Sequence, residues 1–246
     1  LGRADFADSV AAAIRNWHGK DSLVLALYGP WGSGKSSVKN MVLESLRESD
    51  NDCPTIVEFN PWQWSGQDQL AEAFFREIGM ALGKEGSGDN AKERAAKWRS
   101  YGTYLTLSAS LAKAIGPLLT LAGIPVGGLL TNLSEGLSDS SKIAAKGSEG
   151  LLTEAEIANR TLEEKRKDLE RELKSLERPI LVVLDDIDRL SKDEIRLLFQ
   201  LIKANADFPN LIYFTLFQRN IVENALHEIA AEHGSDYLEK IVQVGL

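Results

Sequence analysis

Cysteine and histidine are scarce in this chain, and basic residues are outnumbered by acidic ones. Cys53 is the only cysteine among 246 residues, so an intrachain disulfide is excluded and a reducing, cytoplasmic setting is expected. The three histidines show no spacing typical of metal ligands. Because the formal net charge is −8, the chain lacks the electrostatic footprint of a polyanion-binding protein, and we expect no nucleic-acid partner.

The first residues show an amphipathic pattern in place of a basic and then apolar leader, so we expect no secretory signal. The missing initiator Met and the ending at residues 244–246 lead us to expect a piece of a longer protein. With 43% hydrophobic residues, a chain of 246 residues can bury one large α/β core that carries an insertion. The expected organisation is one domain over residues 1–246, with residues 83–152 inserted into it.

A glycine-rich loop of the form G-x-x-x-x-G-K-S/T occupies residues 29–36. Glycines at the ends of the turn let successive backbone N–H groups curl around phosphates that side chains would block. Lys35 is expected to reach the β- and γ-phosphates and Ser36 to ligate Mg²⁺, while the next helix directs its positive N-terminal end at the anion. We therefore predict a nucleotide site formed by Gly29, Pro30, Trp31, Gly32, Ser33, Gly34, Lys35, Ser36 and Ser37.

An apolar run that ends in acids, at residues 180–190, is the partner that such a loop needs. Asp185 is the expected Mg²⁺ ligand, because the first acid after a buried strand emerges where ligands bind in open α/β sheets. Asp186 is then placed to orient or polarise the attacking water. Asp185, Asp186 and Asp188 would repel one another without a cation nearby, which favours a metal site over a solvated turn. Arg189 is interpreted as neutralising this cluster or contacting a phosphate, with a simple surface ion pair as the alternative.

Apolar periodicity predicts the other elements of an α/β fold. Short apolar runs predict strands at 23–28, 55–59, 180–184 and 211–217, and helical spacing predicts helices at 5–18, after the loop, at 70–82 and at 153–178. Ser191 and Glu194 form a capping box that begins another helix. Gln218 ends the last strand, where its side chain can hydrogen-bond the γ-phosphate or the attacking water; filling space at the strand end is the alternative.

Trp62 and Trp64 follow the 55–59 strand, which Pro61 brings to an end. Packing in the core is the commoner explanation for such tryptophans. Packing under the nucleotide site and forming a partner surface are the alternatives.

The expected insertion begins with a linker rich in Gly, Lys and Glu at residues 83–103. Residues 104–130 carry Lys113 as their only charge. This apolar segment is long enough to cross a bilayer. Its glycines and prolines divide it into pieces too short for one continuous helix. A helical hairpin that dips into a membrane and an apolar patch buried against protein both remain open, and residues 131–150 are expected to be a Ser- and Gly-rich connector.

Four motifs together resemble the KAP family of P-loop NTPases over nearly the whole chain. They are the 29–36 loop, Phe59-Asn60-Pro61-Trp62, Leu184-Asp185-Asp186-Ile187-Asp188-Arg189 and the closing segment 237–243. The resemblance implies an α/β three-layer sandwich with a mainly parallel sheet, in which the 211–217 strand lies between the 23–28 and 180–184 strands. It also implies ATP with Mg²⁺ and a helical insertion that often carries membrane-associated helices. Many relatives carry Asp near the position of Gln218.

These features predict Mg²⁺-dependent ATP hydrolysis that switches a larger, membrane-linked or defence-type assembly, slowly in the isolated chain. The expected catalytic residues are Lys35, Asp186, Gln218 and Arg189, and the expected metal ligands are Ser36 and Asp185. Homo-oligomers, protein partners and membrane contact through residues 104–130 at the inner face of a membrane are the expected associations. The alternatives are a nucleotide-gated scaffold without turnover and a P-loop kinase for a small molecule, although no acceptor-binding motif or basic lid is visible.

Overall fold

The computed structural model describes residues 2–17, 22–48, 53–64, 66–84, 89–107, 162–227 and 234–246. The chain divides into two compact units, Leu1–Ala95 with Glu170–Leu246 and Ala96–Leu169. The described elements are α1 (Arg3–Arg15), β1 (Leu23–Tyr28), α2 (Lys35–Arg47), β2 (Thr55–Phe59), the 3-10 helix η1 (Pro61–Gln63), α3 (Gln67–Leu82), α4 (Asp89–Leu107), a helix at 162–174, β3 (Ile180–Leu184), the 3-10 helix η3 (Ile187–Arg189), α8 (Lys192–Asn205), β4 (Leu211–Phe217), α9 (Arg219–Leu226), α10 (Gly234–Glu239) and β5 (Val244–Gly245).

The first unit contains a five-stranded sheet with the order β2-β3-β4-β1-β5, and every neighbouring pair is parallel. The strands predicted at 23–28, 55–59, 180–184 and 211–217 are confirmed. β4 lies between β1 and β3, as the family resemblance implied. Because all strands run in one direction, the loops after β1, β3 and β4 meet at the same edge of the sheet.

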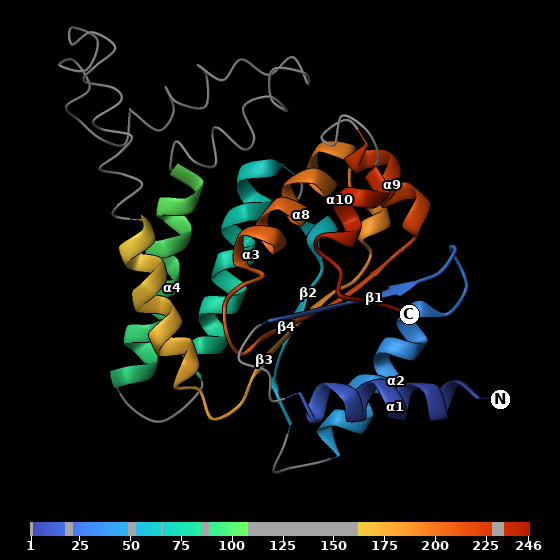
Figure 1. The fold of residues 1–246 in the computed structure, drawn as a ribbon, viewed down its shortest axis with the longest axis horizontal. Helices are drawn as coiled ribbons and strands as arrows, with labels where there is room; N and C mark the ends of the chain where they lie inside the picture. The colour runs from blue at the N-terminus through green and yellow to red at the C-terminus, as the bar shows by residue number, and fades with distance from the viewer. Residues whose placement is uncertain are drawn as a thin grey trace, which may run out of the picture. The chain divides into compact units, whose positions relative to one another are not determined.

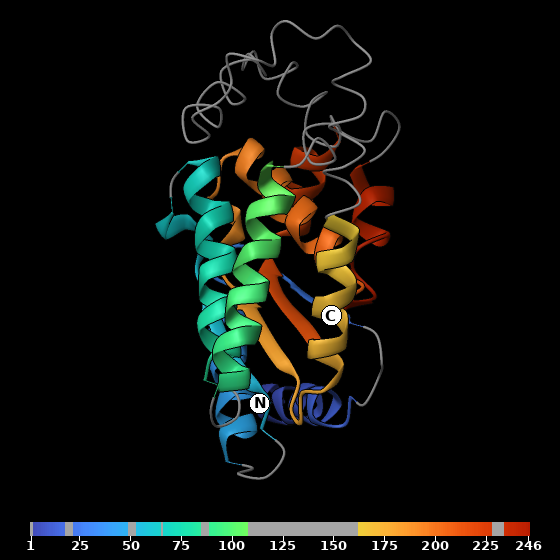
Figure 2. The same cartoon turned by 90° about the vertical axis from the view of Figure 1, so that its left-hand side faces the viewer.

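Helices cover both faces of this sheet, which confirms the predicted three-layer α/β sandwich. In Figures 1 and 2, α1 and α2 lie on one face, and α3, α8, α9 and α10 lie on the other. The strands alternate between the faces, as a two-residue period requires. The strand side chains that pack with α1 and α2 include Leu25, Leu27, Leu181, Val183, Ile212, Phe214 and Leu216.

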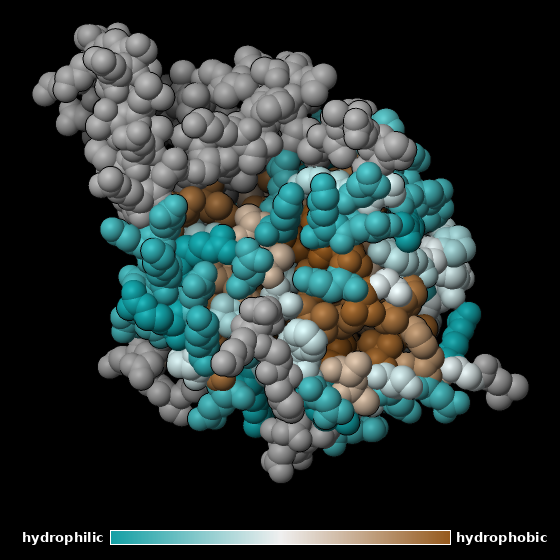
Figure 3. Space-filling model, in the orientation of Figure 1, coloured by the Kyte–Doolittle hydropathy of each residue, from teal (hydrophilic) through white to brown (hydrophobic). Residues whose placement is uncertain are grey.

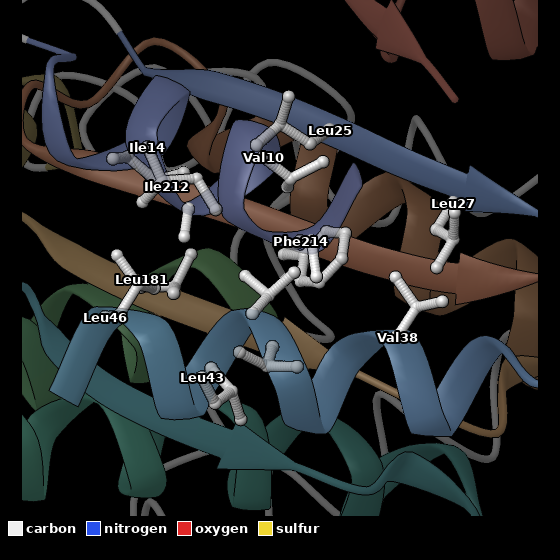
Figure 4. Close-up of a cluster of buried hydrophobic side chains, with 14 of the residues drawn as sticks. Val10, Ile14, Leu25, Leu27, Val38, Leu43, Leu46, Leu181, Ile212 and Phe214 are labelled. Atoms are coloured by element: carbon white, nitrogen blue, oxygen red, sulfur yellow. The ribbon is translucent and has the colours of Figure 1, made fainter. Parts of the chain in front are cut away.

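Figure 4 shows how the helix side chains meet this face of the sheet. Val10 and Ile14 of α1, with Val38 and Leu46 of α2, point from their helices at the strands. Their helical spacing places them on one stripe of each helix, so both helices bury their apolar side. Figure 3 shows the outcome at the surface, where hydrophilic side chains cover the helices and apolar surface concentrates over the sheet between the helical layers. The core thus holds β1 and α2 in place around the loop that joins them.

The prediction of a linker at residues 83–103 is wrong for most of that segment, because α4 occupies Asp89–Leu107. Its buried apolar side chains are Ala91, Ala95, Trp98, Tyr101 and Leu105. They recur every three or four residues and form an apolar stripe that supports a helix despite the nearby Gly, Lys and Glu.

The charged helix expected at 153–178 is described over 162–174, where Leu169 and Leu173 are fully buried. The segments expected as a membrane hairpin beyond residue 107 and as a connector at 131–150 lie outside the described residues. Within the described ranges, none of the helices combines the length and apolarity needed to cross a membrane.

Candidate functional site

The glycine-rich loop connects the carboxyl end of β1 to the first turn of α2, and contact and backbone conformation both demand glycine there. A Cβ on Gly29 would lie 2.5 Å from the Ser33 Oγ. Gly34 has a φ of 88°, in the left-handed region that L side chains rarely adopt. As the N-cap residue of α2, Gly34 has no side chain to bond the first N–H groups of that helix. These N–H groups are the donors that bind phosphate at helix N-termini.

A pocket of about 270 Å³ opens beside this loop. It is lined by Trp31, Gly32, Ser33, Gly34, Lys35, Ser36, Ser37, Asp185, Asp186, Asp188 and Arg189. The parallel pairing of β1, β4 and β3 therefore brings two motifs that are far apart in the sequence to one site. Gly29, Pro30 and Gln218 were predicted to belong to the site but are not among the lining residues.

Lys35 lies against the base of the loop. Its Nζ donates hydrogen bonds to the carbonyl oxygens of Gly29 at 2.8 Å and Pro30 at 3.3 Å. The same Nζ is 3.4 Å from the Asp188 Oδ2. Only 11% of the Lys35 side chain is exposed, so its charge is held at the pocket instead of extending into solvent. These contacts keep the Lys35 ammonium group beside the loop.

Each of the three acids after β3 forms an ion pair with a different basic side chain. The pairs are Asp185 with Lys39 at 3.2 Å, Asp186 with Arg189 at 3.2 Å and Asp188 with Lys35 at 3.4 Å. Among the residues that the structure describes, no group of three or more His, Cys, Asp or Glu side chains is arranged to hold a metal. Because basic side chains already neutralise the three acids, their mutual repulsion does not by itself indicate a metal.

A single carboxylate can still serve Mg²⁺ together with a hydroxyl and phosphate oxygens. Ser36 and Asp185 line the same pocket, and oxygen donors are the ligands that Mg²⁺ prefers. The Asp185 Oδ1 accepts a hydrogen bond from the Asp186 N–H at 2.9 Å. Asp186 has a φ of 58°, a left-handed conformation that aspartate tolerates better than most residues. The donor set thus fits Mg²⁺, with Asp185 fixed by the peptide that follows it.

Gln218 reaches this region through its backbone. Its N–H donates to the Asp188 Oδ1 at 2.5 Å, and the Asp188 side chain is only 6% exposed. Asp188 therefore connects the end of β4 to Lys35, a role that the sequence analysis did not assign. The Gln218 side chain does not line the pocket, so the proposed sensor role receives no support from its position.

The strand before the loop ends in a tyrosine whose ring packs edge-on against Phe217, at 5.2 Å between ring centroids. Burial raises the pKa of Tyr28 above its ordinary value, and the nearby Arg219 opposes this effect. The phenol is therefore neutral at physiological pH, and it adds no charge to the start of the loop.

Comparison with known families agrees with this geometry. A family model described as the KAP family P-loop domain matches residues 3–246. The chain belongs to the KAP family. A relative of this KAP domain, the Phage T7 exclusion protein of Escherichia coli (strain K12), is 27% identical over 253 residues, which cover 99% of this chain and 32% of the relative. The KAP domain thus spans about a third of that relative's length. Membership in a P-loop family supports nucleotide binding at the pocket.

Two tryptophans of the KAP domain, Trp31 and Trp62, flank Arg189 of the pocket. Trp31 is 67% exposed and Trp62 is 43% exposed, so the expectation that Trp62 packs in the core is wrong. The Arg189 guanidinium lies 5.0 Å from the Trp31 ring centroid and 5.4 Å from that of Trp62. Both distances lie within the range of cation–π attraction. Trp64 instead lies under Arg76, at 4.4 Å.

Three further residues near the site were missed in the sequence analysis. Lys39 contacts Asp185 and also lies 3.6 Å from the Glu58 Oε2. Arg3 of α1 donates from Nη2 to the Ser33 carbonyl oxygen at 3.1 Å. The sequence offered one signal for Lys39, which stands one helical turn after Lys35 and shares its face of α2. The contacts of Glu58 and Arg3 depend on tertiary structure and have no local signal.

Proposed function

We propose that this KAP domain binds ATP with Mg²⁺ in the pocket and hydrolyses it, and that turnover switches a larger assembly. The observation that carries the proposal is the single pocket that contains both the Lys35-Ser36 pair of the loop and the Asp185-Asp186 pair after β3. A triphosphate needs donors and a cation, and its hydrolysis needs a group that positions water. These functions can all be supplied by residues that line this pocket.

In this mechanism the loop N–H groups hold the phosphates. The Lys35 ammonium exchanges loop carbonyls for oxygens of the β- and γ-phosphates, so positive charge is in place when negative charge develops. Asp186 accepts a hydrogen bond from the attacking water and orients it in line with the leaving group. Ser36 and Asp185 would hold Mg²⁺, which neutralises charge on the β- and γ-oxygens when it is bound.

The contacts of Arg189 bear on how fast the isolated chain hydrolyses ATP. Arg189 lines the pocket, but its guanidinium is paired with Asp186 and flanked by two tryptophans. We propose that an arginine from a neighbouring subunit completes the site, so the isolated chain turns over slowly. The assembly is proposed to be of a defence type, because the relative of this chain is described as a phage exclusion protein.

Phosphate release tests the hydrolysis. We expect Mg²⁺-dependent release by the wild-type chain, and rates at least about a hundredfold lower for Lys35→Ala and Asp186→Asn, which remove phosphate and water contacts respectively. Lys84→Ala and Asp236→Asn are matched controls, because both residues are exposed and neither lines the pocket. Equal rates for the wild type, Lys35→Ala and Asp186→Asn, with or without Mg²⁺, would contradict this mechanism.

The exposed tryptophans favour one other function. Trp31 and Trp62 present large aromatic surface beside the pocket, as a nucleotide-gated scaffold would. Tight ATP binding without phosphate release, also in the assembled oligomer, would favour this scaffold over the hydrolase.

A further inference from the structure

Lys39 holds the carboxylate that is proposed to bind Mg²⁺. It lies on α2, and its Nζ is 3.2 Å from the Asp185 Oδ2. The exposed fractions of the two side chains are 15% for Lys39 and 12% for Asp185. An ion pair that is largely shielded from water is screened far less than one at the surface. Lys39 is not among the residues that line the pocket, so it approaches Asp185 from beside the pocket.

Both carboxylate oxygens of Asp185 have partners. Oδ1 accepts the Asp186 N–H at 2.9 Å, and Oδ2 faces the Lys39 ammonium. The Asp186 bond is local and follows from the backbone turn, whereas the Lys39 contact depends on the conformation of a long side chain. A cation that binds Asp185 must therefore either displace the ammonium from Oδ2 or share the carboxylate with it at a cost in repulsion.

Glu58 offers the ammonium a second acceptor. The Glu58 Oε2 is 3.6 Å from the Lys39 Nζ, and the parallel register of β2 and β3 pairs Glu58 with Val183, two residues before Asp185. Glu58 is also bound by Arg47 at 2.9 Å, but its side chain remains 46% exposed. Lys39 can therefore shift from Asp185 to Glu58 through a small side-chain movement, without losing an anionic partner.

We propose that Lys39 is a positioning residue that sets the Mg²⁺ affinity of this site by competing with the metal for Asp185, and that Glu58 receives its ammonium when the metal binds. This inference rests on the proposed function, because it assumes that Asp185 serves Mg²⁺. Lys39 stabilises Asp185 in the absence of the metal and weakens metal binding. Mg²⁺ binding thus depends on the movement of the Lys39 ammonium from Asp185, which follows β3, to Glu58 of β2.

The test is calorimetric titration of the chain with ATP at a series of Mg²⁺ concentrations. The quantity compared is the Mg²⁺ concentration that gives half of the full increase in ATP affinity. Lys39→Met is expected to lower this concentration about threefold to tenfold, because the competing ammonium is removed. Glu58→Gln is expected to raise it about twofold, because Lys39 then stays on Asp185. In the double variant the effect of Glu58→Gln should largely disappear.

The control is Arg47→Met, which removes a positive charge from the same helix and a contact with the same Glu58 but has no contact with Asp185. Its half-effect concentration should stay within about twofold of the wild type. Lys39→Arg, which keeps the charge, should also resemble the wild type.

An unchanged or higher Mg²⁺ requirement in Lys39→Met would overturn the inference. If Lys39→Met does not fold, an unchanged requirement in Glu58→Gln, whose side chain is more exposed, would overturn it. Wild-type ATP affinity that is insensitive to Mg²⁺ would instead overturn the proposed function, and this inference with it.

Discussion

Gly29 and Gly32 show that glycines in one loop are required for different reasons. A Cβ on Gly29 would meet the Ser33 Oγ at 2.5 Å and the Lys35 Cγ at 3.3 Å. A Cβ on Gly32 would meet nothing within 4 Å, but its φ of 77° lies in the left-handed region. A side chain on Gly29 would therefore displace Ser33 and Lys35, whereas a side chain on Gly32 would strain the backbone.

This difference predicts that two matched substitutions lower ATP affinity and stability in different proportions. Gly29→Ala should weaken ATP binding about tenfold by displacing Ser33 and Lys35, with a loss of unfolding free energy below about 1 kcal/mol. Gly32→Ala should lose about 1–2 kcal/mol of unfolding free energy through strain, with a smaller effect on ATP affinity. Calorimetric ATP titration and urea denaturation measure the two quantities. Equal losses of affinity in both variants would show that contact at Gly29 is not the deciding factor.

The residues of the site could be predicted from the sequence only where a motif fixes their spacing. Lys35, Ser36 and Asp185 follow from local patterns around a strand end, and the structure brings them to one pocket. Lys39 and Glu58 act through a pairing across elements, which no local pattern encodes. The exposure of Trp62 also escaped prediction, because its contact with Arg189 joins two segments that are far apart in the sequence.

At the scale of elements, the start of α8 is held by the capping box that the sequence predicted. The Ser191 side chain accepts the Glu194 N–H, and Glu194 accepts the Ser191 N–H at 2.9 Å and hydroxyl at 2.7 Å. The other oxygen of Glu194 accepts the Gly66 N–H at 2.9 Å, just before α3. The cap therefore does more than begin one helix, since it also connects α8 to the segment after η1.

These bonds predict how stability depends on pH. Burial alone would raise the pKa of Glu194, but hydrogen bonds from Gly66 and Ser191 outweigh it and lower the pKa below its ordinary value. A carboxyl group whose pKa is lowered in the folded state stabilises the fold at pH values above its ordinary pKa. This contribution is lost as the pH falls through the pKa of the folded state. Solvent screens these bonds because Glu194 is only partly buried, so Glu194→Gln should cost at most about 1 kcal/mol of unfolding free energy at pH 7.

The measurement is urea denaturation of the wild type and Glu194→Gln from pH 7 down to the acid limit of the fold. The difference between the two should shrink as the pH falls below the ordinary pKa of a glutamate, about 4.3. Glu164→Gln is a control on the described helix at 162–174, where the side chain is exposed. A difference that stays constant over the whole range would contradict the role of the charged carboxylate.

Elements with a strong local pattern could be predicted, and those with competing signals could not. The strands of the sheet stand out because fully buried parallel strands are short, continuous apolar runs. α4 was missed because its charged and small residues masked a stripe of buried side chains centred on Trp98 and Tyr101.

At the scale of the whole molecule, strand order decides whether the pocket exists. β4 separates β1 from β3, so the loop after β1 and the acids after β3 meet across the end of β4. The residue pattern predicts four of the strands but not their order, which the resemblance to the KAP family supplied. Asp188 bridges the gap that β4 creates, because it bonds both the end of that strand and Lys35.

The central claim is that this arrangement binds ATP, and calorimetric titration with ATP and Mg²⁺ tests it most directly. We predict one ATP per chain for the wild type, and affinity at least about tenfold lower for Lys35→Ala, because a charge-assisted contact to phosphate is lost. Circular dichroism should show that the variant keeps the fold. Absence of binding heat in the wild type, or equal affinity in a folded Lys35→Ala, would contradict the account.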